Sequence, residues 1–173
     1  AHNMKVTTVV FREMGELLEQ MFGAKMRQGN GKEEIEVLTS AGKSRWFLMA
    51  GRENAPRGFH ADLVWIDEIQ EFASDTVNRG FQPTMKTRNT LTAGGSPLLL
   101  LSGTAGDQSS DYQIDYRERA IQNIENEVLT REHLAEWSPP ANIAWTDRRA
   151  WLWANPSVPT LLSMDALEND FVK

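Results

Sequence analysis

The stretch of sequence that decides the fold is residues 61–68, which read ADLVWIDE. Four apolar residues, 63–66, come directly before two acids, Asp67 and Glu68. A short apolar run of this kind is typical of a strand buried in a parallel sheet, and α/β sheets bind ligands at the edge where such strands end. The stretch therefore predicts a buried strand over residues 62–66 that delivers two carboxylates to a binding edge.

This order of residues is the Walker B pattern of nucleotide hydrolases. In that interpretation Asp67 holds Mg²⁺, which prefers oxygen ligands. Glu68 orients or deprotonates the water that attacks the γ-phosphate of ATP. The alternative is a core strand that ends in two solvated acids. Apolar runs followed by acids are common, so the pattern needs support from elsewhere in the chain.

A second apolar run supplies such support. Residues 98–101 are four leucines, and SGTAG follows them at 102–106. In ATP-driven motors a strand beside the Walker B strand carries a loop of this composition, and a hydroxyl in the loop senses the γ-phosphate. Thr104 and Ser102 are therefore candidate coupling residues, and Thr104 joins Asp67 as a candidate nucleotide contact. Taken alone, the loop is equally consistent with a glycine-rich turn. If both interpretations hold, the two strands are parallel neighbours with Asp67 and Thr104 on one edge.

A third candidate is Arg57, in the loop before the first of these strands. An arginine near a γ-phosphate can stabilise the charge of the transition state. The alternative for Arg57 is a solvated loop residue with no contact to a nucleotide.

One similar pattern is rejected. Residues 40–44, SAGKS, resemble the end of a phosphate-binding P-loop. The position five before Gly42 should be glycine and is Val37. A P-loop must also open a helix, whereas the residues that follow, RWFLM, predict a strand. The chain therefore carries the second half of an ATPase site without the first half.

The remaining sequence predicts an alternation of helices and apolar strands through residue 125, which is typical of an α/β fold. A helix is expected to begin near Glu68 and to break at 73–75, and residues 76–86 are ambiguous because Gly80 and Pro83 interrupt them. The other expected elements are helices over 4–22, 112–125, 147–154 with Asp147 as N-cap, and 165–172, a hairpin of 34–38 with 45–50, and a short strand over 132–137.

Composition excludes several classes of protein. The 173 residues contain no cysteine, which excludes disulfides and thiolate metal sites, and no apolar run approaches the length of a membrane span. The net charge of −6 argues against strong DNA binding by this chain alone. The chain opens on Ala1 rather than methionine, so we expect it to be a fragment of a longer protein.

The motifs taken together, in this order, resemble those of phage large terminases. The resemblance covers most of the chain, and its segments are GR at 51–52, RGFHADLVWIDEIQE at 57–71, SGTAG at 102–106, EWS at 136–138, DRRAW at 147–151 and ANPS at 154–157. Each segment alone is unspecific, whereas the ordered set is specific.

The resemblance implies an α/β fold, a RecA-like P-loop NTPase core with a mainly parallel sheet, truncated at its N-terminus. Residues 1–130 would form part of this ATPase core, and residues 131–173 would be the segment that leads towards a nuclease domain. The phosphate-binding Walker A motif is then expected upstream of Ala1 and the nuclease downstream of Lys173. The chain alone is accordingly not expected to hydrolyse ATP well or to cut DNA.

The resemblance also implies roles and partners. Asp67 becomes the Mg²⁺ residue, Glu68 the catalytic carboxylate and Thr104, with Ser102, the coupling hydroxyls. Arg57 matches an arginine that in some terminases reaches the site of the neighbouring subunit. The implied cofactors are ATP and Mg²⁺. The implied partners are double-stranded DNA, a portal protein, a small terminase subunit and further copies of the chain in a ring, in the host cytoplasm at the procapsid and without a membrane.

Two other functions fit parts of the same pattern. Residues 67–70 resemble the DExx box of a superfamily 2 helicase, and residues 102–104 resemble its SAT motif. However, the segments at 136–138 and 154–157 do not resemble the second domain of such a helicase. A non-catalytic assembly module with a decayed site is the other alternative. Retention of Asp67, Glu68 and Thr104 argues mildly against such decay.

Overall fold

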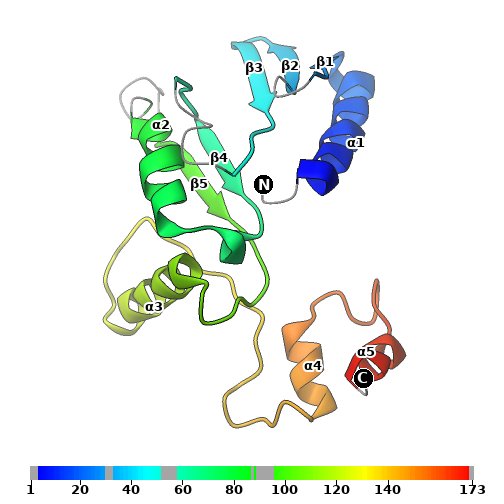
Figure 1. The fold of residues 1–173 in the computed structure, drawn as a ribbon, viewed down its shortest axis with the longest axis vertical. Helices are drawn as coiled ribbons and strands as arrows, with labels where there is room; N and C mark the ends of the chain where they lie inside the picture. The colour runs from blue at the N-terminus through cyan, green and yellow to red at the C-terminus, as the bar shows by residue number, and fades with distance from the viewer. Residues whose placement is uncertain (1–3, 30–32, 52–57, 87, 89–95, 172–173) are drawn as a thin grey trace. The chain divides into compact units, whose positions relative to one another are not determined.

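The computed structural model describes residues 4–29, 33–51, 58–86, 88 and 96–171 (Figure 1). The chain divides into two compact units, Ala1–Glu118 and Arg119–Lys173. The described residues contain a three-stranded antiparallel sheet and a two-stranded parallel sheet, both in the first unit. Two sheets of this size are compatible with an α/β fold but do not define a RecA-like core, which stays a prediction together with the division at residue 130. No helix in this part of the chain is long and apolar enough to cross a lipid bilayer.

The first unit begins with the predicted helix and with a hairpin whose second strand lies at 42–47 rather than at the predicted 45–50. The elements are α1 (Met4–Phe22), β1 (Lys25–Arg27), β2 (Glu34–Thr39) and β3 (Gly42–Phe47), with the three strands antiparallel in that order. Phe11 of α1, Ile35 of β2 and Ala24 are buried together in one hydrophobic core. Figure 1 shows α1 running alongside the sheet. Strand β1 is too short for its alternation to be recognised in the sequence.

The hairpin turn confirms that residues 40–44 are not a phosphate-binding loop. Gly42 opens strand β3, and Thr39 Oγ1 donates a hydrogen bond to the carbonyl oxygen of Gly42 at 2.9 Å. A P-loop places its backbone N–H groups at the start of a helix. Here the corresponding residues lie in a strand ladder, with Ser44 opposite Val37.

The predicted parallel pair is present. Strands β4 (Leu63–Ile66) and β5 (Leu98–Leu101) are parallel, in register from Leu63 opposite Leu98 to Ile66 opposite Leu101. Strand β4 begins one residue later than predicted, although the carbonyl oxygen of Asp62 still accepts a hydrogen bond from Leu98 N at 2.9 Å.

The two faces of this pair differ in burial. Val64 and Ile66 are buried in a hydrophobic core. Three helical elements also contribute to this core, namely η2 (Thr76–Phe81), α2 (Gln82–Lys86) and α3 (Asp111–Glu125), through residues that include Val77, Phe81 and Tyr112. The residues of the other face are exposed, namely Leu63, Trp65, Leu98 and Leu100. Within the described residues, the predicted buried strand is therefore covered on one face only.

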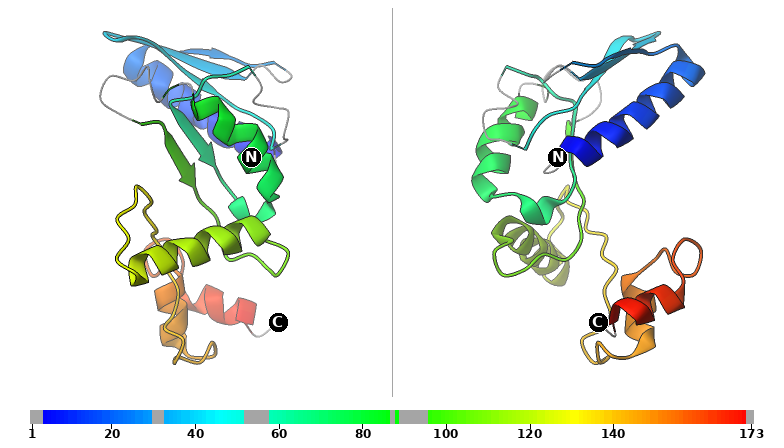
Figure 2. Two further views of the ribbon diagram at one scale, coloured as in Figure 1. Left: turned by 90° about the vertical axis from the view of Figure 1, so that its left-hand side faces the viewer. Right: turned by 45° about the vertical axis from the view of Figure 1, so that its right-hand side comes forward.

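Residues 76–86, for which the sequence was ambiguous, are helical. A 3₁₀ turn, η1 (Ile69–Glu71), is followed by a π-helical turn, η2 (Thr76–Phe81), and by α2 (Gln82–Lys86). In an α-helix each N–H donates to the carbonyl oxygen four residues back. Gln82 N donates instead to the carbonyl of Val77, five residues back. Both views of Figure 2 place η2 and α2 beside the parallel pair.

Helix α3 (Asp111–Glu125) confirms the helix predicted over 112–125. The short strand predicted over 132–137 is wrong, because these residues have no regular structure. The segment reads EHLAEW and has three apolar residues that a strand could bury. However, a strand needs a neighbour for its backbone hydrogen bonds, and the described residues provide none here. Pro139 and Pro140 follow directly and cannot donate to a ladder.

The second unit contains two short helices at the predicted places, α4 (Arg148–Ala154) and α5 (Met164–Phe171). Asp147 is the N-cap of α4, as predicted, because its carboxylate oxygen Oδ1 accepts a hydrogen bond from Arg149 N at 2.8 Å. The helix ends at Ala154, before Asn155 and Pro156, because the residue before a proline disfavours the helical conformation.

We expect Asp147 to hold the first turn of α4. Asp147→Ala removes the acceptor, so the Arg149 amide should exchange with solvent faster. Asp147→Asn keeps an acceptor oxygen and should exchange nearly as slowly as wild type. Amide exchange measured by NMR compares the three proteins. Equal protection of Arg149 in Asp147→Ala and wild type would contradict the capping role.

The same cap is expected to resist acid. The side-chain hydrogen bond from Arg149, and then the backbone hydrogen bond from Arg149, lower the pKa of Asp147 from 3.8 to about 2. Because the folded pKa is depressed, the stabilisation by the carboxylate is complete above 3.8 and is lost only as the pH falls through about 2. The NMR titration of the Asp147 carboxyl should therefore have its midpoint near 2 rather than near 3.8.

Candidate functional site

The carboxyl ends of β4 and β5 lie together and are joined by backbone hydrogen bonds beyond the last paired residues. Ser102 N donates to the carbonyl oxygen of Ile66, and Ile69 N donates to the carbonyl oxygen of Ser102, each at 3.0 Å. The segments that follow the two strands are therefore held side by side. These segments contain the predicted acids, Asp67 and Glu68, and the predicted coupling loop.

Three side chains form a chain of hydrogen bonds along this edge. Trp65 Nε1 donates to Ser102 Oγ at 2.8 Å, and Ser102 Oγ donates to Asp67 Oδ1 at 2.7 Å. Because the indole N–H occupies one lone pair of the hydroxyl, the hydroxyl proton is directed at the carboxylate. Asp67 is exposed, and its second carboxylate oxygen makes no hydrogen bond to another described residue. One carboxylate oxygen is therefore fixed and the other faces solvent.

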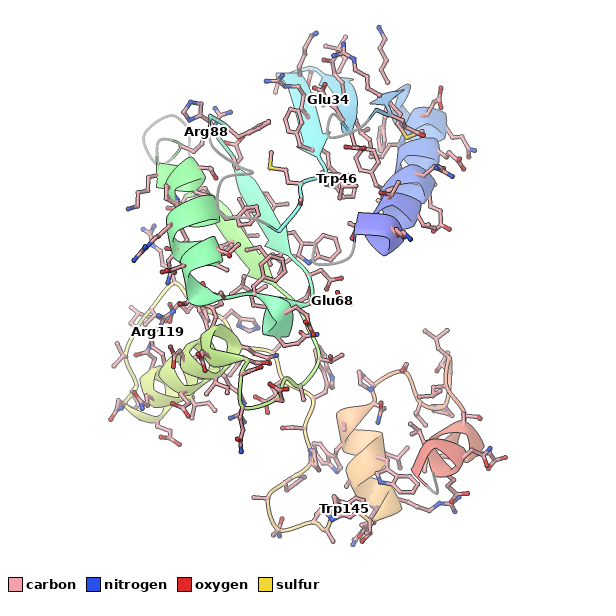
Figure 3. All side chains as sticks on the ribbon, in the orientation of Figure 1. Glu34, Trp46, Glu68, Arg88, Arg119 and Trp145 are labelled. Atoms are coloured by element: carbon pink, nitrogen blue, oxygen red, sulfur yellow. The ribbon has the colours of Figure 1, made fainter. Side chains whose placement is uncertain are left out.

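Glu68 has an unusual backbone conformation. Its φ of 57° and ψ of 49° lie in the left-handed region, which side chains other than glycine and asparagine seldom adopt. The residue forms the turn between β4 and η1, and its side chain is exposed and does not cap the following turn (Figure 3). Strained conformations of this kind concentrate at functional sites. The turn directs the Glu68 carboxylate away from the core at the same edge as Asp67.

The loop over residues 102–106 is packed closely on the turn that follows the acids. A Cβ atom added to Gly103 would lie 2.3 Å from Gln70 Oε1 and 3.1 Å from the backbone nitrogen of Ile69. A side chain at position 103 would therefore have to displace the end of Gln70 and would press on the backbone of Ile69. Gln70 Nε2 also reaches Thr104 Oγ1 at 3.4 Å, which is a long hydrogen bond. The two halves of the candidate site are therefore in direct contact.

Helix α3 holds the other side of the loop. Gln113 Nε2 donates to the carbonyl oxygen of Thr104 at 2.7 Å, and Gly106 N donates to Gln113 Oε1 at 2.9 Å. After the loop, Asp107 accepts hydrogen bonds from the hydroxyl and then the backbone N–H of Ser109, which lower the pKa of Asp107 below its ordinary value. A row of ordered hydrogen bonds thus connects the coupling loop to the start of α3.

Four of the five predicted site residues lie together at this edge. Asp67 and Ser102 are in contact, Glu68 follows Asp67 in the turn, and Thr104 is linked to this turn through Gln70. Arg57 lies outside the described residues.

Three residues of the edge were not identified from the sequence as site residues, namely Trp65, Gln70 and Gln113. Gln70 lies inside the stretch that carries the terminase resemblance, which is a signal that could have identified it. Trp65 reads as one more apolar residue of the strand. Gln113 has no distinguishing pattern, because it is one of several polar residues in an amphipathic helix.

Asp67 and Glu68 are the acids at this edge that could hold a divalent cation. Among the described residues, no three histidine, aspartate or glutamate side chains gather where they could hold a metal ion. Mg²⁺ usually takes one or two carboxylates and completes its coordination with water and substrate phosphates. Asp67 offers one oriented carboxylate with a solvent-facing oxygen, and Glu68 adds a second acid beside it. These residues therefore suit a metal that arrives with a nucleotide.

Comparison with protein-family models, with curated proteins and with solved structures finds no match to this chain.

Proposed function

We propose that this chain is part of the ATP-hydrolysing motor of a phage large terminase, which moves double-stranded DNA into a capsid. The observation that carries the proposal is the hydrogen bond between Ser102 and Asp67. It joins the acidic end of one parallel strand to the hydroxyl-containing loop of its neighbour. In a core strand that merely ends in solvated acids, nothing would require this contact.

Asp67 is the residue proposed to hold Mg²⁺. Ser102 fixes one of its oxygens, which leaves the other directed to solvent and reduces the reorganisation needed when a cation binds. When bound with ATP, Mg²⁺ neutralises charge that develops on the phosphate oxygens. Trp65 keeps the Ser102 hydroxyl in the orientation that Asp67 requires.

Glu68 is proposed to orient the attacking water and to accept its proton. Its carboxylate is exposed at the carboxyl edge, next to Asp67 and clear of the hydrogen bonds that occupy its neighbour. A general base has to remain accessible to water and to reach the reacting atoms. The left-handed turn supports this role, since it brings the second acid out of the strand direction immediately after the first.

Thr104 and Ser102 are proposed as coupling residues. The loop that contains them contacts the turn after the acids through Gln70 and the start of α3 through Gln113. A change in the contacts of Thr104 would therefore reach two other elements by direct hydrogen bonds. This arrangement supports a role in passing the state of the nucleotide to the rest of the protein.

The proposed partners are DNA, a portal protein, a small terminase subunit and further copies of this chain in a ring. The net charge of −6 is unfavourable for holding DNA by this chain alone. A ring, or other domains of the longer protein, would then supply the positive field that DNA requires.

The role of Glu68 is tested by Glu68→Gln in a protein that joins this chain to the upstream phosphate-binding segment expected of a terminase. ATP binding should persist, because Asp67 and the phosphate contacts remain. Turnover should fall about a hundredfold or more, because the amide cannot accept the proton of the water. Steady-state hydrolysis and binding of a fluorescent ATP analogue provide the two measurements.

The matched control is Glu118→Gln, which makes the same chemical change at an exposed position of α3. It should leave both binding and turnover close to wild type. Near-normal turnover in Glu68→Gln would refute the assigned role, and absence of hydrolysis in the wild-type protein would favour a non-catalytic module instead.

We further propose that Arg57 acts on the ATP of a neighbouring subunit. Arg57→Ala subunits and Glu68→Gln subunits should each be inactive as pure rings. In mixed rings, some interfaces pair an intact Glu68 with an intact Arg57 from the neighbour, so part of the activity should return. An arginine supplied by a neighbour is worth about 10³–10⁵ in rate in other nucleotide hydrolases.

The control for this mixing experiment combines Glu68→Gln subunits with subunits that carry both changes. Such rings contain no intact Glu68 and should stay inactive. If Arg57→Ala with Glu68→Gln gives no recovery in rings shown to contain both subunits, Arg57 does not act in trans. Full activity of Arg57→Ala alone would exclude any role for this arginine in hydrolysis.

A further inference from the structure

Gln113 has no part in the chemistry proposed above, yet it makes two hydrogen bonds to the coupling loop. Its Nε2 donates to the carbonyl oxygen of Thr104 at 2.7 Å, and its Oε1 accepts from Gly106 N at 2.9 Å. The side-chain amide therefore pairs with two backbone groups that lie two residues apart in the loop. A neighbouring strand satisfies backbone groups in the same way, by offering one donor and one acceptor.

This pairing is specific to the amide of glutamine. Glutamate could accept from Gly106 N but has no donor for the carbonyl oxygen of Thr104, and leucine of similar size offers neither group. Without Gln113, the carbonyl oxygen of Thr104 and the N–H of Gly106, both of exposed residues, would pair with water and lose the fixed orientation that the side chain gives them. The conformation of the loop accordingly depends on both ends of the Gln113 side chain.

The close packing of Gly106 reinforces this dependence. A Cβ atom at Gly106 would lie 2.2 Å from Ser110 Oγ and 2.7 Å from Gln113 Oε1. The backbone of the loop thus rests directly on the start of α3, with no side chain between them. Ser110 is buried, and its hydroxyl oxygen accepts a hydrogen bond from Asp107 N at 3.2 Å. Ser110 therefore also holds the residue that follows Gly106.

Thr104 is consequently held at two points. Its carbonyl oxygen is bound by Gln113 of α3, and its hydroxyl lies 3.4 Å from Gln70 Nε2. The carbonyl contact is short, whereas the hydroxyl contact is long. A ligand that approaches the carboxyl edge can therefore displace Gln70 from the hydroxyl while the backbone of Thr104 stays in place.

We propose that Gln113 is a positioning residue, which clamps the backbone of Thr104 and Gly106 to α3 and thereby presents the Thr104 hydroxyl to a nucleotide. The clamp itself rests on the two hydrogen bonds. Its catalytic consequence rests on the function proposed above. The experiment therefore separates the clamp from its consequence.

The clamp is tested in the 173-residue chain by amide exchange, measured by NMR without any nucleotide. Gln113→Leu should speed the exchange of the Gly106 amide about fivefold or more, because its acceptor is removed. Gln122→Leu is the matched control, since Gln122 is exposed on the same helix. Unchanged exchange of Gly106 in Gln113→Leu would overturn the clamp.

Gln113→Glu separates the two hydrogen bonds. It keeps the acceptor for Gly106 and loses the donor for Thr104, so the Gly106 amide should stay protected. In the longer protein that carries the phosphate-binding segment, kcat for ATP hydrolysis should nevertheless fall about tenfold or more, because Thr104 is no longer fixed. The KM for ATP should stay within about twofold, since Gln113 itself contacts no nucleotide.

A purely structural role would not produce this combination of a protected amide and a lower kcat. Wild-type kcat in Gln113→Glu would overturn the positioning role even if the clamp is confirmed. A wild-type protein that hydrolyses no ATP would overturn the proposed function and the catalytic part of this inference. The exchange of Gly106 would still decide whether the clamp exists.

Discussion

The parallel direction of β4 and β5 is the constraint on which the candidate site depends. In a parallel pair both chains leave the sheet at the same edge, so Asp67 and Ser102 emerge as neighbours. An antiparallel pair would bring Ser102 next to Asp62 and leave the two acids without a partner. The close approach of Gly103 to the turn after the acids follows from the same geometry, since Ser102 and Ile69 continue the backbone ladder beyond the strands.

The parallel pair, with the two acids and the loop over residues 102–106 at one edge, could be predicted because it depends on short-range patterns. Apolar runs of strand length, each followed by polar residues, determine which end of each strand carries the chemistry. The run at 63–66 and the run at 98–101 needed only a common direction to bring Asp67 and Ser102 together. The N-cap at Asp147 was predictable for a similar reason, because a cap is a contact between residues two or three positions apart.

Other features depend on contacts that a one-dimensional pattern does not contain. The strand expected at 132–137 would have needed a neighbouring strand to stabilise it. The π-helical turn before Pro83 pairs Gln82 N with a carbonyl five residues back rather than four, which sequence periodicity does not show. The side-chain amides of Gln70 and Gln113 contact Thr104, which is distant from both in the sequence. Glutamine is common at polar positions, so the sequence alone does not reveal these contacts. The exposure of one face of the strand pair could not be predicted either, because the sequence of its leucines is the same as that of a buried strand.

The left-handed backbone of Glu68 puts thermostability and activity in conflict at a single position. A residue with a side chain pays about 1–2 kcal/mol for this conformation, whereas glycine adopts it freely. Directed evolution of this chain for heat resistance alone would therefore favour replacement of Glu68 by glycine or asparagine. Variants selected in that way would gain a relaxed turn and lose the carboxylate. A screen that rewards folding without also requiring turnover would accordingly remove the residue to which we assign the chemistry.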